Sequence, residues 1–101
     1  MAKRNPLGVV WAASAFKHGF EPEDAITAIL GAIVHVEDYE GTPGLRLWIG
    51  PRTDVRGEIL EVIAEVVQPD GLVVFHVDRI TEQRRRDHRV DQILDRLKED
   101  I

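Results

Sequence analysis

Two short stretches of the chain carry the residue types that proton transfer and phosphate binding require. The first is the dipeptide Lys17-His18, and the second contains His76 and Arg79. A lysine ammonium binds a phosphate as a point charge, and an arginine holds one through two parallel hydrogen bonds. An imidazole gains and loses a proton near neutral pH. Both stretches are therefore candidates for acid–base chemistry on a phosphate ester.

Ordinary structural roles explain the same residues equally well. Lys17 could be a surface lysine, and Arg79 could form an ion pair with Asp78 or a nearby glutamate. The basic run at 84–86 is a third candidate, in which Arg84 and Arg85 would contact RNA phosphates. It could also be a solvated helix face that balances its acidic neighbours. Residue types alone leave these alternatives open.

The sequence argues against metal and nucleophile chemistry. It contains no cysteine, so thiolate nucleophiles and cysteine-ligated metals are excluded. The four histidines are far apart, and no pair has the HxxxH or HExxH spacing of a zinc site. We therefore expect neither a metal nor another cofactor. A small-ligand or metal site made by His35 and His76 is kept as a minor alternative, which requires that folding bring them together.

Length and charge limit the possible architectures and partners. The chain has 101 residues, of which 44% are hydrophobic, as in one globular domain spanning residues 1–101. Its net charge is −5, with acids concentrated in residues 21–78, so it is not a uniformly basic nucleic-acid binder. It has no apolar run of membrane-spanning length and no signal-peptide cleavage pattern, so we expect a cytoplasmic protein without membrane contact.

Two helices are predicted near the N-terminus. Residues 21–31 carry Pro22 at the start, acids in the first turn and an apolar stripe, which together indicate a helix. A shorter helix is predicted around residues 12–17, ending at Gly19. This arrangement places Lys17 and His18 at the corner between the two helices.

Four segments have the alternation or β-branched content of strands, and they are residues 33–37, 45–49, 58–67 and 72–77. The short connections between them favour antiparallel pairing. Alternation in the fourth segment places His76 and Asp78 on one face of the sheet. It places Phe75, Val77 and Arg79 on the other.

A long helix is predicted over residues 81–100, capped by Thr81. Its apolar stripe, with the spacing of one helix face, consists of Val90, Ile93, Leu94 and Leu97. The stripe would pack on the sheet or form a partner interface. The predicted fold is therefore α+β, with a four-stranded antiparallel sheet, N-terminal helices and a long C-terminal helix. Its core would span about residues 11–80.

Several motifs together resemble a known family. Residues 17–20 (KHGF) followed by residues 23–25 (EDA) resemble the opening of BrnT-type toxins, which belong to bacterial type II toxin–antitoxin systems. Residues 48–50 (WIG), Gly57 with residues 59–62 (ILEV), and Arg79 before the last helix are similar to later patterns of that family. The resemblance covers about residues 11–86 and implies a RelE-like α+β fold.

The resemblance also implies an activity, which is metal-independent cleavage of RNA that an antitoxin protein neutralises. Attack by a 2′-hydroxyl needs a base, a proton donor and positive charge on the phosphorane. On this expectation Lys17 and Arg79 neutralise the phosphate, with Arg52 as an addition from a loop. His18 transfers protons, and His76 is the second candidate for that role.

The chain departs from the family pattern at Glu58, where an arginine is usual, and at Asp78, where a small residue is usual. The alternative function is a non-catalytic interaction domain of the same fold. It would bind a partner or a second copy of the chain through the sheet edge and the C-terminal stripe. An enzyme should bring Lys17, Arg79 and a histidine to one place, whereas an interaction domain should keep them apart or ion-paired.

Overall fold

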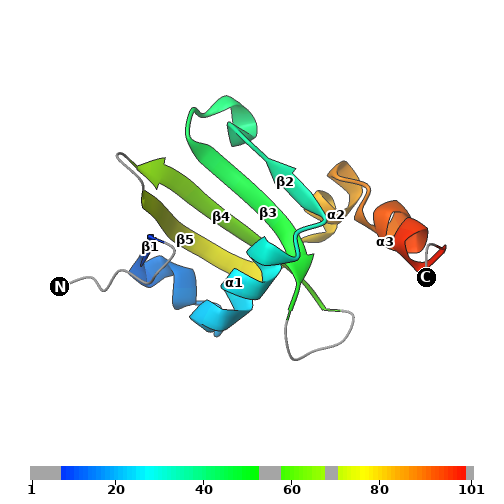
Figure 1. The fold of residues 1–101 in the computed structure, drawn as a ribbon, viewed down its shortest axis with the longest axis horizontal. Coiled ribbons are helices and arrows are strands. Elements are labelled where there is room, and N and C mark those ends of the chain that lie inside the picture. The colour runs from blue at the N-terminus through cyan, green and yellow to red at the C-terminus, as the bar shows by residue number, and fades with distance from the viewer. Residues whose placement is uncertain (1–7, 53–57, 68–70, 100–101) are drawn as a thin grey trace.

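A computed structural model of the chain describes residues 8–52, 58–67 and 71–99. Its elements, in chain order, are β1 (Val9–Trp11), the 3₁₀ helix η1 (Ala13–Phe16), α1 (Pro22–Leu30), β2 (Val34–Val36), the 3₁₀ helix η2 (Tyr39–Gly41), β3 (Leu45–Pro51), β4 (Ile59–Val67), β5 (Gly71–Arg79), α2 (Glu82–Asp87) and α3 (Val90–Glu99). The strands form one mixed sheet in the order β1-β5-β4-β3-β2. Figure 1 shows α1 lying across this sheet and α3 projecting beyond its end.

The α+β class is confirmed, but the prediction of a four-stranded antiparallel sheet is wrong. The four predicted strands are present as β2 to β5, and each pairs antiparallel with its neighbour in sequence. The missed strand is β1, which pairs parallel with β5, Val9 lying opposite Leu72 and Trp11 opposite Val74. Residues 9–11 (VVW) are uniformly apolar and show no alternation, so this strand carried no signal in the sequence.

A bulge in β5 changes which residues share a face of the sheet. Ile63 pairs with His76, whereas the next residue of β4 pairs with Val74, so that Phe75 is the extra residue. Phe75 therefore packs in a different core cluster from Val77, and the prediction that both lie on one face is wrong. One inserted residue reverses the side-chain alternation beyond it.

The first face of the sheet is covered by α1. This helix starts with a capping box in which the Asp24 carboxylate accepts a hydrogen bond from the Glu21 amide at 2.9 Å. Ala25 and Ala28 are completely buried against the sheet. Gly50 of β3 permits this close approach, because a Cβ there would lie 2.1 Å from the Ala28 carbonyl oxygen.

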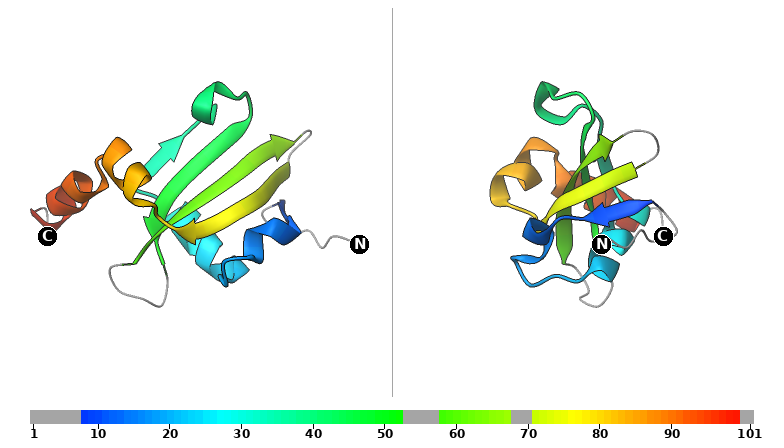
Figure 2. Two further views of the ribbon diagram at one scale, coloured as in Figure 1. Left: turned by 180° about the vertical axis from the view of Figure 1, so that it is seen from behind. Right: turned by 90° about the vertical axis from the view of Figure 1, so that its left-hand side faces the viewer.

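The opposite face of the sheet packs on the C-terminal segment. This segment forms two helices, α2 and α3, so the prediction of a single long helix over residues 81–100 is wrong. Arg89 adopts a left-handed backbone with φ 52°, which separates α2 from α3. The break brings Val90 into the core beside Leu47 and Ile63, where it is completely buried. Figure 2 shows α2 on the other side of the sheet from α1, with α3 continuing beyond the end of the sheet.

The predicted N-terminal helix is a single 3₁₀ turn, η1, rather than an α-helix over residues 12–17. Lys17 and His18 lie in the turn between η1 and α1, as predicted. Gly57 and residue 100, which the sequence patterns included, lie outside the described residues. Among the helices that are described, none is long and apolar enough to cross a membrane.

Candidate functional site

His18 and His76, which were separate candidates in the sequence, meet at the edge of β5. Beyond the short strand β1, η1 covers this edge, and the Ser14 hydroxyl donates a hydrogen bond to the Phe75 carbonyl at 2.9 Å. The chain then turns so that the two imidazole rings lie edge to face, with centroids 5.7 Å apart and an interplanar angle of 76°. The tertiary fold thus assembles a histidine pair from two distant segments.

Each imidazole of the pair faces a carboxylate. His76 Nε2 lies 2.8 Å from Glu61 Oε2, and His18 Nδ1 lies 3.6 Å from Asp78 Oδ2. An ionised carboxylate only accepts hydrogen bonds, so the Nε2 of His76 carries a proton. The side chains of His18 and His76 are 33% and 24% exposed, so both are partly accessible to solvent. Within the described residues, their other ring nitrogens form no hydrogen bond to a side chain or to the backbone.

Glu61 connects this pair to the interior. Its carboxylate is completely buried and accepts hydrogen bonds from His76, from the Thr81 amide at 2.7 Å and from a terminal nitrogen of Arg84. Burial by itself raises the pKa of Glu61. The hydrogen bonds from His76 and Thr81 and the charge of Arg84 outweigh that effect, and the pKa is lowered. Glu61 is therefore a charged group held in the core.

Sequence reasoning missed Glu61. Its only signal was an acid between the apolar residues Leu60 and Val62, at a position that reads as the polar face of a strand. The structure shows instead that both faces of β4 are covered at this point, and Leu60, Glu61 and Val62 are all completely buried. A buried acid on a strand indicates a partner network rather than a solvent-facing surface.

Arg84 and Arg85, which were predicted to contact RNA, both have carboxylate partners. The Nε of Arg84 donates to the Tyr39 hydroxyl at 3.0 Å, and another nitrogen binds Glu61. Desolvation lowers the pKa of Arg84, but the Tyr39 hydrogen bond and the Glu61 charge raise it by more. Arg85 donates to Asp91 at 2.5 Å. Arg84 is thus a half-buried structural cation whose remaining donors border a pocket.

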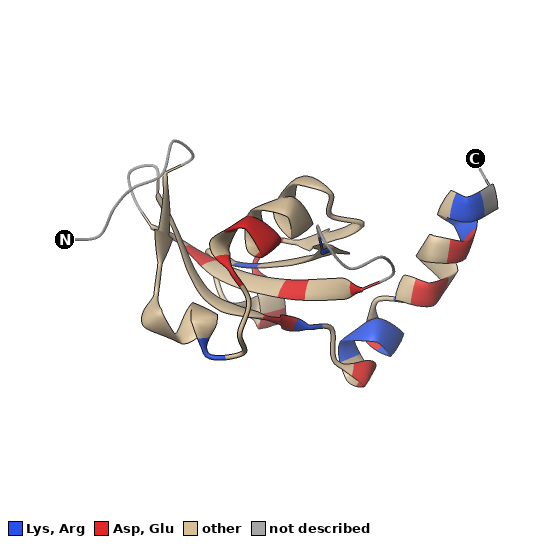
Figure 3. Cartoon of the chain, turned by 90° about the horizontal axis from the view of Figure 1, so that it is seen from below, with Lys and Arg blue, Asp and Glu red and all other residues tan. Residues whose placement is uncertain are grey.

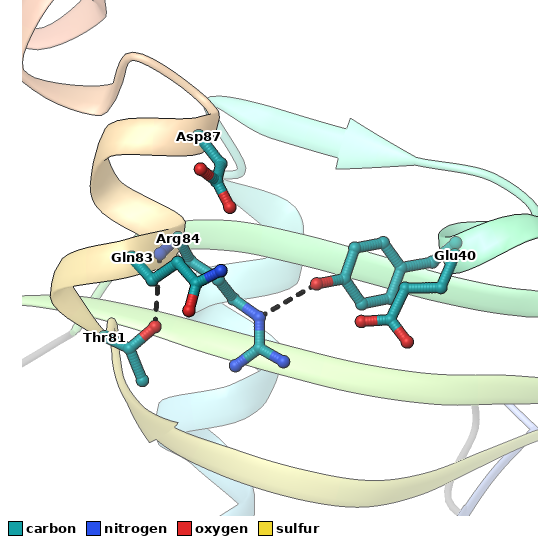
Figure 4. A pocket seen from close by; sticks show the side chains of 6 residues that line it. Glu40, Thr81, Gln83, Arg84 and Asp87 are labelled. Atoms are coloured by element: carbon teal, nitrogen blue, oxygen red, sulfur yellow. Dashed lines mark hydrogen bonds between the residues drawn. The ribbon is translucent and has the colours of Figure 1, made fainter.

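This pocket has a volume of about 290 Å³ and lies between η2 and α2. It is lined by Tyr39, Glu40, Thr81, Gln83, Arg84 and Asp87, as Figure 4 shows. Figure 3 shows basic residues gathered on α2 together with acidic residues of the same helix, and further acidic residues over the sheet and the other helices. The pocket lining therefore combines one cation, Arg84 of α2, with two carboxylates, Glu40 of η2 and Asp87 of α2.

The remaining arginine candidates form a second cluster on the α1 side of the sheet. Glu58 accepts hydrogen bonds from Arg79 Nε at 2.5 Å and from an Arg52 terminal nitrogen at 3.1 Å. Arg52 Nε also lies 3.4 Å from Asp24, and the Phe20 ring lies under both guanidinium groups. The hydrogen bond from Arg79 lowers the pKa of Glu58, assisted by Arg52. The same pairing with Glu58 raises the pKa of Arg52.

The structure brings together only part of the predicted catalytic set. Lys17 is exposed and adjoins His18 of the histidine pair in the chain. Arg79 lies opposite Leu60 in the sheet register, on the face that packs on α1, and its side chain is 71% exposed. Its recorded partners are the residues of the Glu58 cluster. The strand alternation thus separates Arg79 from His76.

Part of the predicted partner stripe packs against the core of the chain itself. Val90 is completely buried and Leu94 packs half-buried against the same core cluster. Ile93 is half-buried, and Leu97 is 46% exposed. Leu30, at the end of α1, is 75% exposed. A partner surface on the C-terminal segment would therefore center on Leu97 rather than on the whole stripe.

The minor alternative of a joint site for His35 and His76 is wrong. His35 stacks on Trp48 with centroids 5.0 Å apart, and Trp48 belongs to the core cluster under α1. His76 lies on β5 opposite Ile63, on the other face, and β4 and β3 separate it from the strand of His35. Within residues 8–52, 58–67 and 71–99, no three histidine, cysteine or acidic side chains form a metal-binding group.

Comparisons with protein-family models, curated proteins and solved structures find no match. The resemblance to BrnT-type toxins therefore stays a prediction from short motifs. The geometry of the histidine pair, its carboxylates and the neighbouring pocket provides the evidence on function.

Proposed function

We propose that this chain is a BrnT-like, RelE-like endoribonuclease that cleaves RNA without a metal ion. The observation that supports the proposal best is the edge-to-face contact of His18 and His76, whose ring centroids lie 5.7 Å apart. A carboxylate lies beside each ring. Cleavage by the neighbouring 2′-hydroxyl requires two proton transfers, and imidazole is the side chain best suited to both at neutral pH. Two partly exposed imidazoles on one surface meet that requirement.

The proposed reaction balances with these two groups alone. One imidazole accepts the 2′-hydroxyl proton as the 2′-oxygen forms a bond to phosphorus. The bond from phosphorus to the 5′-oxygen breaks, and the other imidazole gives its proton to that oxygen. The products are a 2′,3′-cyclic phosphate and a 5′-hydroxyl. Glu61 and Asp78 orient the rings, as the carboxylate partner of a catalytic histidine does in other hydrolases.

Positive charge for the phosphorane comes from Lys17 in this proposal. Lys17 is exposed beside His18, whereas Arg79 and Arg52 are bound to Glu58 and face the α1 side. Arg79, whose side chain is 71% exposed, would have to leave Glu58 and reach around the edge of β5 to act as the second cation. Charge placed where the transition state develops it is the largest single contribution in many enzymes.

The test is cleavage of an unstructured RNA in the presence of EDTA. The parent protein should release fragments ending in a cyclic phosphate, and His18→Ala, His76→Ala and Lys17→Ala should each be strongly impaired. His35→Ala and Lys98→Ala are matched controls, because these residues lie outside the histidine pair. Equal cleavage by all variants would indicate contamination, and no cleavage by folded parent protein would reject the proposal.

One observation favors the second candidate, a protein-interaction surface on α3. This helix projects beyond the sheet and exposes Leu97 (Figure 1). The partner would be an antitoxin protein, as the family resemblance implies, or a second copy of the chain. Sedimentation of the parent beside Leu97→Glu tests self-association. A concentration-dependent dimer that the substitution abolishes would support the second copy, and a monomeric parent would exclude it.

A further inference from the structure

The pocket between η2 and α2 has no role in the proton transfers described above. We propose that it is a base-recognition subsite that takes a guanine of the RNA. The inference rests on the proposed ribonuclease function, because it assigns the pocket to the same substrate. It makes a separate claim, however, which is that the chain recognises guanine itself whether or not it cleaves the strand.

The pocket is joined to the histidine pair by one continuous set of hydrogen bonds. His76 donates to Glu61 at 2.8 Å, Glu61 also accepts from Arg84, and Arg84 donates to Tyr39 at 3.0 Å. All of these groups lie on the face of the sheet opposite α1, because Ile63, the cross-strand partner of His76, packs there. A nucleotide whose phosphate meets the histidines therefore has this pocket beside it.

Guanine carries acceptors at N7 and O6 and donors at N1 and N2. Arg84 supplies the donors for the first edge, since its bonds to Tyr39 and Glu61 occupy two of the five N–H groups of a guanidinium. Arginine is the side chain that most often binds the N7 and O6 edge. Tyr39 adds an aromatic wall of the kind on which bases stack.

The second edge of guanine needs acceptors, and Glu40 and Asp87 provide them. Within the described residues, neither carboxylate forms a hydrogen bond or an ion pair, although the charge of Glu40 contributes to the raised pKa of Arg84. Figure 4 shows both side chains around the space next to Arg84. These two acids repel a phosphate, so the pocket suits a base with donors rather than the RNA backbone.

The loop that carries Glu40 is held in one conformation. Asp38 and Glu40 both have left-handed backbones, with φ 49° and φ 56°. The Asp38 carboxylate accepts a hydrogen bond from the Gly44 amide at 3.1 Å, which fixes the loop on the start of β3. The loop that carries Glu40 is thus tied to the sheet before a ligand binds, which reduces the ordering cost of binding.

Isothermal titration with guanosine tests the subsite, because a nucleoside has no phosphate and is not cleaved. We expect guanosine to bind at least about tenfold more tightly than adenosine, cytidine or uridine, in line with the loss of one good bidentate contact. Glu40→Gln should reduce guanosine affinity by a similar factor, since an amide presents a donor to the N1 and N2 edge. Glu82→Gln, an exposed acid outside the pocket, is the matched control and should bind like the parent.

The outcomes separate the two proposals. Equal affinity for all four nucleosides, no measurable guanosine binding, or unchanged guanosine affinity in Glu40→Gln overturns the guanine subsite, even if RNA is cleaved. Selective guanosine binding that His18→Ala retains supports the subsite. If that binding occurs and the folded parent does not cleave RNA in EDTA, the subsite stands and the ribonuclease proposal fails.

Discussion

The imidazole of His76 lies 2.8 Å from the completely buried carboxylate of Glu61, across the central strands β4 and β5. A charged acid at this depth is stable only because Arg84 and the Thr81 amide bind it as well. One core glutamate thereby orients a surface histidine, anchors the start of α2 and holds the arginine that borders the pocket. Structure and proposed chemistry depend on the same group.

Removing the cation from this network should cost more stability than removing the whole pair. Arg84→Met leaves Glu61 buried without its main counter-charge, and the expected loss is about 3–5 kcal/mol in the free energy of unfolding. The double variant Glu61→Leu with Arg84→Met removes both charges and should be more stable than Arg84→Met alone. Urea unfolding of the three proteins measures the difference. A double variant less stable than the single one would contradict the assignment of Glu61 as a charged core group.

Stability should fall in acid. Hydrogen bonds from arginine lower the pKa of Glu58, and the network around Glu61 lowers its pKa against the effect of burial. A lowered pKa in the folded state means that the stabilisation is fully present above the ordinary glutamate value of about 4.3. This stabilisation is lost as the pH falls through the lowered pKa values of Glu58 and Glu61 in the folded state. Urea midpoints should therefore drop below about pH 4, and less steeply in Glu61→Gln. A midpoint independent of pH between 7 and 3 would be inconsistent with ionised Glu58 and Glu61.

Gly50 should tolerate no side chain. A Cβ at this position would lie 2.1 Å from the Ala28 carbonyl oxygen, so Gly50→Ala must push α1 away from β3. We expect a loss of about 3 kcal/mol, at the upper end for overpacking because the obstacle is backbone. Gly41→Ala is the control: it has open space but φ +74°, so only conformational strain of about 1–2 kcal/mol is expected. Comparable losses in the two variants would mean that α1 does not pack this closely on the sheet.

The C-terminal segment should divide into a core part and a surface part. Val90 is completely buried, and Val90→Ala should lower the free energy of unfolding by about 1.5–3 kcal/mol. Leu97 is 46% exposed, and Leu97→Ala should stay within about 0.5 kcal/mol of the parent. Thermal unfolding at one protein concentration compares them. Equal effects would indicate that α3 does not dock on the sheet through its first turn.

Activity should depend on both imidazoles and on Lys17. His18→Ala and His76→Ala are each expected to lower the rate of RNA cleavage by about 10²–10⁴, the usual contribution of a positioned acid or base. Lys17→Ala should cost about 10²–10³ through the loss of charge on the phosphorane. A bell-shaped pH–rate profile in the parent should lose one limb in each histidine variant. Retention of both limbs in either variant would remove that histidine from the proton transfers.

The sequence by itself determined the class of the fold and most of its elements. Pro22 with acids in the first turn predicted α1, and alternation or β-branched content predicted β2 to β5, because these signals come from neighbouring residues. Lys17 and His18 were also correctly placed in the turn before α1. Local preferences were sufficient wherever the residues of an element and its flanks carry a capping, alternating or β-branched signal.

Only the tertiary structure decided the features on which the candidate site depends. The parallel strand β1 is uniformly apolar (VVW), shows no alternation and is formed by pairing with β5. The break at Arg89 lets Val90 enter the core, although the helical periodicity runs through it. The meeting of His18 with His76, and the burial of Glu61 between them and Arg84, join segments far apart in the chain. Such contacts are set by how the sheet is covered on both faces, and no local pattern of residues encodes that.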